Sequence, residues 1–282
     1  MADAAVSKAV LITGCSTGIG RATAIRLAER GWTVYATARN IGSIADLADS
    51  GCKLLPLDVC DEASMQAAVS TIETAEGGVG VLVNNAGYSQ DGAIEEVPID
   101  EVRRQFETNV FGLARLTQLV LPGMRRQGWG RIINVSSMGG RLTFPGGGYY
   151  HATKHAVEAI SDALRFEVRP FGIDVVVIEP GAIRTAFEET SLSTMSPNGD
   201  SPYGELNEVV TKRVQATYRG RLAAEPSVVA KVIEKAASAR RPKTRYVITA
   251  GARMLLMTRR VLPDRAFDAL LRTQFRVGKP SD

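Results

Sequence analysis

Short apolar runs alternate along the chain with longer stretches in which apolar residues recur every three or four positions. Glycine, proline or polar residues bound the apolar runs, which is typical of strands buried in a parallel sheet. These runs cover residues 9–13, 31–39, 53–59, 80–83, 131–137, 174–178 and 245–249. The stretches between them predict amphipathic helices over residues 20–30, 61–76, 100–127, 150–169 and 226–239, and a weaker helix over 44–50.

This alternation predicts the fold class. Parallel strands joined through helices require right-handed crossovers, which place helices on both faces of the sheet. We therefore expect an α/β protein with a single doubly wound parallel sheet, a Rossmann fold. No linker or shift in composition interrupts the pattern, so residues 1–282 are interpreted as one domain.

A glycine-rich loop joins the first predicted strand to the first helix. Its glycines follow the order G-x3-G-x-G, which differs from the common dinucleotide-binding spacing G-x-G-x-x-G. Glycines at such a turn let backbone N–H groups approach a pyrophosphate at the helix N-terminus, although a plain glycine turn is the alternative. The predicted cofactor-binding residues of this loop are Gly14, Ser16, Thr17, Gly18, Ile19 and Gly20.

The end of the second predicted strand bears on the choice of cofactor. An acidic residue about 20 positions beyond the glycine loop binds the ribose 2′-hydroxyl of NAD. In this chain Ala38 occupies that place and Arg39 follows it. A guanidinium pairs with a 2′-phosphate, so the sequence favours NADP(H) over NAD(H). The alternative is an ordinary arginine at an exposed strand end.

Tyr150 and Lys154 are one helical turn apart, so their side chains lie on the same face of the predicted helix, whereas Tyr149 does not. A nearby ammonium favours the phenolate and lowers the tyrosine pKa from its usual value of about 10. Taken alone the pair is a weak signal, because many amphipathic helices carry such residues as a solvated pair. Ser137, thirteen residues before Tyr150, ends the fifth apolar run and adds a third polar group.

Five stretches together resemble the short-chain dehydrogenase/reductase family. They are the Ser-x12-Tyr-x3-Lys spacing, the Thr-Gly-x3-Gly-x-Gly loop, Asn-Asn-Ala-Gly at 84–87, Asn-Val-x-Gly at 109–112 and Pro-Gly-x-Ile-x-Thr at 180–185. The resemblance implies reversible hydride transfer between NADP(H) and a carbonyl or secondary alcohol. A general likeness to the hydroxysteroid and retinol dehydrogenases implies a lipophilic substrate.

The resemblance also implies roles for individual residues. Tyr150 is expected to act as general acid in reduction and general base in oxidation, while Lys154 lowers its pKa and binds the nicotinamide ribose. Ser137 is expected to hydrogen-bond the substrate oxygen, and Asn109 to position a water for proton relay. The other residues implied to contact the cofactor are Asp58, Val59, Asn85, Ala86, Gly87, Pro180, Gly181, Ile183 and Thr185. The alternative is an NAD(P)(H)-binding regulatory protein that has lost catalysis.

The periodic pattern is lost in residues 186–221. In the family this region, here 186–223, is the substrate lid, and we expect it to be largely irregular. Residues 253–275 then place leucine, methionine and phenylalanine at helical spacing with arginines between them. We interpret the extension 251–282 as a cover for the substrate pocket or a dimer surface, in preference to a helix lying on a membrane surface.

Composition narrows the function classes. The chain is 45% hydrophobic and 23% charged, as in ordinary soluble proteins. The net charge of +4 is confined to residues 251–282, so a nucleic-acid-binding surface is not expected. No apolar run approaches the roughly 18 residues of a membrane span, and residues 1–5 lack the basic start of a signal peptide.

The remaining expectations concern metals, compartment and assembly. Three cysteines without ligand spacing and two histidines argue against a metal site and suit a reducing cytoplasm. In the family, the helices corresponding to residues 100–127 and 150–169 pair across a two-fold axis. A homodimer or homotetramer is therefore expected.

Overall fold

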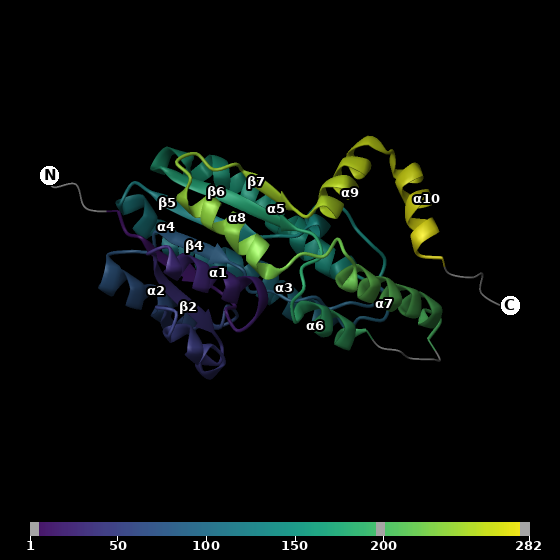
Figure 1. Cartoon of the computed structure of the whole chain (residues 1–282), viewed down its shortest axis with the longest axis horizontal. Coiled ribbons are helices and arrows are strands. Elements are labelled where there is room, and N and C mark those ends of the chain that lie inside the picture. Colours follow the sequence, from purple (N-terminus) through teal and green to yellow (C-terminus); the bar gives the residue numbers. More distant parts are fainter. Residues whose placement is uncertain (1–5, 196–200, 277–282) are drawn as a thin grey trace.

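The computed structural model describes residues 6–195 and 201–276, in which seven strands form one parallel sheet (Figure 1). The strand order is β3-β2-β1-β4-β5-β6-β7. The first strand therefore lies inside the sheet, β2 and β3 are added on one side of it, and β4 to β7 are added on the other. This is the doubly wound topology, and it confirms the predicted fold class. The strands are β1 (Ala9–Ile12), β2 (Thr33–Ala38), β3 (Lys53–Pro56), β4 (Val81–Asn84), β5 (Gly130–Val135), β6 (Ile173–Pro180) and β7 (Arg245–Ile248).

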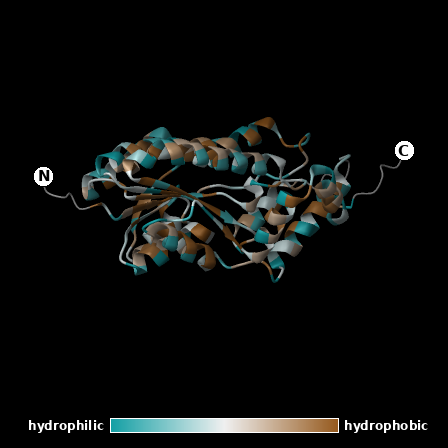
Figure 2. Ribbon diagram, turned by 90° about the horizontal axis from the view of Figure 1, so that it is seen from above, coloured by the Kyte–Doolittle hydropathy of each residue, from teal (hydrophilic) through white to brown (hydrophobic). Residues whose placement is uncertain are grey.

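Helices cover both faces of the sheet. Helices α1 (Gly18–Glu29) and α8 (Pro226–Ser238) pack on one face. Helices α2 (Glu62–Glu76), α4 (Gly112–Arg126) and α5 (Gly148–Val168) pack on the other. Figure 2 shows the apolar strands between these two layers. Within the described residues, no helix is both long and apolar enough to cross a membrane.

Strand β1 shows why the central strands are apolar throughout. Val10 and Ile12 belong to the core beneath α1 and α8, whereas Ala9 and Leu11 pack beneath α2 and α4. Successive side chains of a strand point to opposite faces, and both faces are covered here. All four residues are therefore buried, which produces the continuous apolar run seen in the sequence.

The region 186–221 is more regular than the sequence suggests. It contains α6 (Phe187–Thr194) and α7 (Gly204–Arg219), so the expectation of a largely irregular segment was wrong. The physical reason is that α6 buries Ser191 rather than an apolar stripe, which leaves no periodic signal. Residues 196–200 of this region, like residues 1–5 and 277–282, lie outside the described part of the chain.

Two predicted helices are each divided. The stretch 100–127 consists of α3 (Ile99–Phe106), a π-helical turn η2 (Glu107–Phe111) and α4. The stretch 253–275 forms α9 (Ala250–Val261) and α10 (Asp264–Gln274), which are separated at Pro263 because proline does not continue a helix. The weak helix at 44–50 is a 3₁₀ helix, η1 (Ile41–Ala48), and a shorter one, η3 (Met138–Gly140), follows β5.

Helices α6, α7, α9 and α10 gather beyond one end of the sheet (Figure 1). Segments that follow β1, β4 and β5 reach the same end, because parallel strands share the position of their carboxyl ends. In open α/β sheets this end, at the point where the strand order reverses, is where ligands bind.

Candidate active site

A cavity of ≈ 1140 Å³ lies at the carboxyl ends of the strands, between the sheet and the helices α6, α7 and α9. Most of the residues predicted from the sequence line it. They are Gly14, Ser16, Thr17, Gly18, Ile19, Arg39, Asp58, Val59, Asn85, Ala86, Gly87, Ser137, Tyr150, Lys154, Pro180, Gly181, Ile183 and Thr185. Gly20 and Asn109, also predicted, do not line it and have to be considered separately.

The glycine loop has the backbone that a phosphate cradle needs. Gly14 and Gly18 have φ angles of 71° and 59°, which residues with a Cβ rarely adopt. Gly20 packs against the start of the loop, where a Cβ would lie 2.3 Å from the Gly14 carbonyl oxygen. Gly20 therefore holds the loop closed, while the N-terminus of α1 stays free of side-chain caps. These residues fit a dinucleotide pyrophosphate.

Thr13 joins this loop to the segment after β4, a role that the sequence reasoning missed. Its hydroxyl accepts hydrogen bonds from the backbone N–H groups of Asn85 (3.0 Å) and Ala86 (2.9 Å). The Asn85 side chain returns two bonds, to the carbonyl oxygens of Thr13 (2.9 Å) and Gly14 (3.1 Å). Asn85 thus braces two strand ends at the cavity wall. The signal available was a threonine directly before the first glycine of the loop.

Ser137, Tyr150 and Lys154 meet on the opposite wall. Ser137 lies between β5 and η3, and its hydroxyl accepts a hydrogen bond from the Gly139 N–H at 3.0 Å. It also hydrogen-bonds the Tyr150 hydroxyl. Lys154 Nζ lies 5.8 Å from the centre of the Tyr150 ring and donates to the Val135 carbonyl oxygen at 2.9 Å. Strand β5 and helix α5 therefore bring together the three groups that the spacing predicts.

The electrostatics of this group differ from the sequence-based expectation. Burial raises the pKa of the Tyr150 phenol above its usual value, and the hydrogen bond with Ser137 opposes this increase. Burial also lowers the pKa of Lys154 to about 8, against the effect of the Glu158 carboxylate. Lys154 was expected to lower the pKa of Tyr150. In this structure desolvation is the largest effect on both pKa values, since Lys154 is buried and Tyr150 is half-buried in the cavity wall.

Asn109 lies in the π-helical turn η2, with its side chain buried. Its amide nitrogen donates to the Tyr88 carbonyl oxygen (2.8 Å) and the Thr153 hydroxyl (3.2 Å), and its amide oxygen accepts from the Tyr88 N–H (3.0 Å). The asparagine therefore ties η2 to the segment after β4. It also packs closely on Gly87, where a Cβ would lie 2.9 Å from the Asn109 amide oxygen and 3.7 Å from Lys154 Nζ.

Arg39 and Asp58 lie at the other end of the cavity. Arg39 is exposed, and it forms no ion pair with any residue of the described chain. The Asp58 carboxylate accepts a hydrogen bond from the Cys60 N–H at 2.9 Å, but the cap of α2 is Asp61. Asp58 therefore does not cap α2, and the guanidinium of Arg39 stays available to a ligand.

A buried carboxylate near Tyr150 was not predicted from the sequence. Asp91 lines the cavity and accepts hydrogen bonds from the hydroxyls of Ser89 and Ser191. Its backbone N–H donates to the Thr194 hydroxyl at 3.0 Å. These contacts attach α6 to the segment after β4. A single acid in an irregular segment gave no periodic or motif signal by which to find it.

The chain belongs to the short-chain dehydrogenase family, whose family model matches residues 8–196. An NADPH-dependent 3-dehydrocapnine reductase of Ornithobacterium rhinotracheale is 37% identical over 269 residues, which cover 92% of this chain and 94% of that protein. A short-chain dehydrogenase from Streptomyces avermitilis has a TM-score of 0.77 and 33% identity, and the match covers 95% of this chain and 96% of that one. One from Burkholderia phymatum in complex with NAD has a TM-score of 0.77 and 25% identity, over 98% and 97% of the two chains.

The family membership gives the class of reaction. The chain is an NAD(P)-dependent oxidoreductase that acts on CH–OH and C=O groups. The similar proteins are described with NADPH in one case and with NAD in another, so family membership alone leaves the cofactor open.

Proposed function

We propose that this protein is an NADP(H)-dependent oxidoreductase in which Tyr150 transfers a proton to or from the oxygen of a lipophilic ketone or secondary alcohol. The observation that carries the proposal is the meeting of Ser137, Tyr150 and Lys154 on one wall of the cavity that also contains the glycine loop. Both the cofactor and the substrate can therefore reach the same phenol.

Arg39 supports the preference for NADP(H). It is an exposed cation at the edge of the cavity and has no ion pair among the residues that the structure describes. Its neighbour Ala38 is buried and places no carboxylate there to repel a 2′-phosphate. The glycine loop, Asn85, Ala86 and Thr185 would hold the rest of the dinucleotide. The description of a similar reductase as NADPH-dependent agrees with this choice.

Four residues have separate roles in the reduction of the substrate carbonyl group. When bound, NADPH supplies the hydride. Tyr150 donates its proton to the substrate oxygen, and Ser137 donates a hydrogen bond to the same oxygen as negative charge develops there. Lys154 keeps a positive charge near the phenol, so that the phenolate left behind is stabilised. Asn109 holds η2 in place, and a water at this turn would return a proton to Tyr150.

Apolar side chains on the far wall support a lipophilic substrate. The cavity there is lined by Phe144, Phe187, Val210, Val214, Leu222, Met254, Leu255 and Phe275. Most come from the helices α6, α7 and α9 and from the end of α10, whereas Phe144 precedes α5 and Leu222 follows α7. The polar residues that line the cavity on the same elements include Arg213, Tyr218 and Gln274, and Asp91 adds a carboxylate from the segment after β4. Ligand pockets of this type bind by apolar burial and orient the ligand with few polar contacts. We propose that α6 and α7 form the substrate lid.

The decisive experiment replaces Tyr150 by phenylalanine. Tyr150→Phe removes the transferable proton and keeps the ring, so kcat should fall by about 10²–10⁴-fold while NADPH binding is retained. Tyr149→Phe is the matched control, because it removes a neighbouring hydroxyl that only donates to the Ile94 carbonyl oxygen at 3.2 Å. A panel of lipophilic ketones assayed with NADPH gives the rates. Full turnover by Tyr150→Phe would refute the proposal, and NADPH binding without turnover of any substrate by the wild type would favour a regulatory protein.

A further inference from the structure

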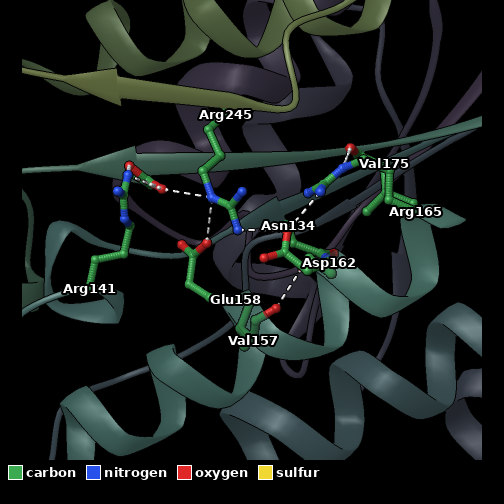
Figure 3. Close-up of polar contacts among 10 residues, drawn as sticks. Asn134, Arg141, Val157, Glu158, Asp162, Arg165, Val175 and Arg245 are labelled. Carbon is green, nitrogen blue, oxygen red and sulfur yellow. Dashed lines mark hydrogen bonds and ion pairs between the residues drawn. The ribbon is translucent and has the colours of Figure 1, made fainter.

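Three arginines and three carboxylates form a connected cluster between α5 and the strands β6 and β7 (Figure 3). Arg245 of β7 is at its centre. Its Nε lies 3.0 Å from Glu158 Oε2 and 3.2 Å from Glu179 Oε1, and its Nη2 lies 2.7 Å from Asp162 Oδ1. The outer partners are Arg141, which lies 3.4 Å from Glu179, and Arg165, which lies 2.7 Å from Asp162.

The cluster is buried where it approaches the active site. Glu179 is wholly buried on β6, and Glu158 is 8% exposed at its side chain, whereas Asp162 is 47% exposed. Charges interact more strongly where water is excluded. Glu158 Oε1 has no hydrogen-bond partner in the described chain, so this oxygen carries charge that no donor neutralises.

Glu158 and Lys154 are neighbours on α5. They are one helical turn apart, so their side chains share a face of the helix. Gly140 packs against this part of α5, because a Cβ there would lie 2.9 Å from Glu158 Cγ and 3.0 Å from the backbone carbonyl oxygen of Lys154. The lysine ammonium donates to the Val135 carbonyl oxygen, and it forms no ion pair with a carboxylate of the described chain. Glu158 is therefore the acid placed to compensate the buried charge of Lys154.

The other groups that face this pair do not replace Glu158. On α5 itself, the neighbouring titratable side chains are Tyr150, His151 and His155, none of which is a carboxylate, and β5 offers Lys154 only a carbonyl oxygen. From β7, Arg245 neutralises part of the Glu158 charge, and from β6 the Glu179 carboxylate is matched by Arg245 and Arg141. Arg245 therefore orients the Glu158 carboxylate through Oε2, while Oε1 has no hydrogen-bond partner in the described chain.

We propose that Glu158, held in place by Arg245, is a positioning residue that keeps Lys154 positively charged in the active site. The inference rests on the proposed function, since it concerns the charge that supports Tyr150. Burial lowers the pKa of Lys154 to about 8, close to neutral pH. Loss of the Glu158 carboxylate would lower this pKa further and so move the lysine toward its neutral form.

Titration of Lys154 tests this directly in the ligand-free full chain. In protein labelled with ¹³C at the lysine Cε, the Cε chemical shift of Lys154 reports its protonation, and the spectrum of Lys154→Met identifies the resonance. In Glu158→Gln, the Lys154 pKa should fall by about one unit, a tenfold change in proton affinity. The alkaline limb of the pH profile of kcat should move to lower pH by a similar amount.

Two variants serve as controls. Asp162→Asn removes another partner of Arg245 but lies two turns from Lys154, so it should leave the Lys154 titration unchanged. Glu158→Asp keeps the charge and should restore the titration largely to that of the wild type, even if Glu158→Gln folds poorly. An unchanged Lys154 pKa in Glu158→Gln, or an equal decrease in Asp162→Asn, would overturn the inference. Because this readout requires no turnover, its failure is separate from that of Tyr150→Phe.

Discussion

Ala38 and Arg39 are the two residues on which the proposed preference for NADP(H) rests. Ala38 is the last residue of β2 and is buried, so an acid at this position would lie beside the cavity that both residues line. Arg39 follows it as an exposed cation without an intramolecular partner in the described chain. The proposed selectivity for NADP(H) therefore rests on one charge at the end of one strand.

NADPH should bind more tightly than NADH. A charge-assisted hydrogen bond from Arg39 to the 2′-phosphate contributes about 1.5–3 kcal/mol, which corresponds to about ten- to a hundredfold in affinity. Arg39→Ala should reduce that ratio, and Ala38→Asp should reverse it through repulsion. Fluorescence titration of both nucleotides measures each Kd. Tighter binding of NADH to the wild type would contradict the proposed role of Arg39.

The residues of the site differ in how far they can be predicted from sequence. Ser137, Tyr150 and Lys154 lie within 18 residues of one another in the sequence. They meet in space because Ser137 directly follows β5 and the other two lie on α5, which packs beside it. The partners Arg245 and Glu158 are 87 residues apart, and they meet only because α5 packs on β6 and β6 pairs with β7. No local pattern encodes such a contact. The pKa of Tyr150 was also beyond prediction, because it depends on burial as well as on the neighbouring charge.

Helix α6 is held to the sheet mainly by polar contacts. Its Ser191 donates to the buried Asp91 carboxylate, and its Thr194 hydroxyl accepts from the Asp91 N–H. A helix attached in this way is stabilised by a few hydrogen bonds instead of a broad apolar face. Its attachment should therefore be weaker than that of the helices in the two cores.

Asp91→Ala should loosen α6. The change removes the acceptor of two hydroxyl groups, and each such bond contributes about 0.5–3 kcal/mol. Amide hydrogen exchange in residues 187–194 should therefore accelerate by about tenfold or more, as measured by mass spectrometry. Glu189→Ala, on the exposed side of the same helix, should leave the exchange unchanged. Unaltered protection in Asp91→Ala would show that α6 is held by other contacts.

The same polar attachment explains why α6 was not predicted. Strands and helices whose buried positions are apolar and recur regularly, such as β1 and α2, produce a period that can be read from the sequence. Helix α6 has eight residues and buries a serine, so the sequence resembles a loop. Pattern-based prediction therefore succeeded where apolar burial forms the element and failed where polar contacts form it.

At the scale of the whole molecule, α4 and α5 cover one face of the sheet and leave large apolar side chains in solvent. Phe166 on α5 is 76% exposed, and Phe111 at the end of η2 is 54% exposed. Both lie in the helical regions that were expected to pair across a two-fold axis. Their exposure in the isolated chain is what a subunit interface would cover.

The protein should be a dimer or tetramer at micromolar concentration, as measured by light scattering. Phe166→Glu places a charge in the expected interface and should shift the mass toward the monomer. Met257→Glu is the control, because Met257 is 69% exposed on the distant helix α9. A monomeric wild type would contradict the prediction, and dissociation of Met257→Glu alone would place the interface on α9.

The helices α7, α9 and α10 all lie beyond residue 196, where the family match ends, yet they form much of the apolar cavity wall. The chain therefore consists of a part that matches the family and carries the glycine loop and Tyr150, and a later part that shapes the apolar wall of the cavity. Grafting the residues after β7 from another reductase should change which carbonyl compounds are accepted, while the cofactor and the proton-transfer group stay as they are. Substrate range in this scaffold can thus diverge without any change in the chemistry that it serves.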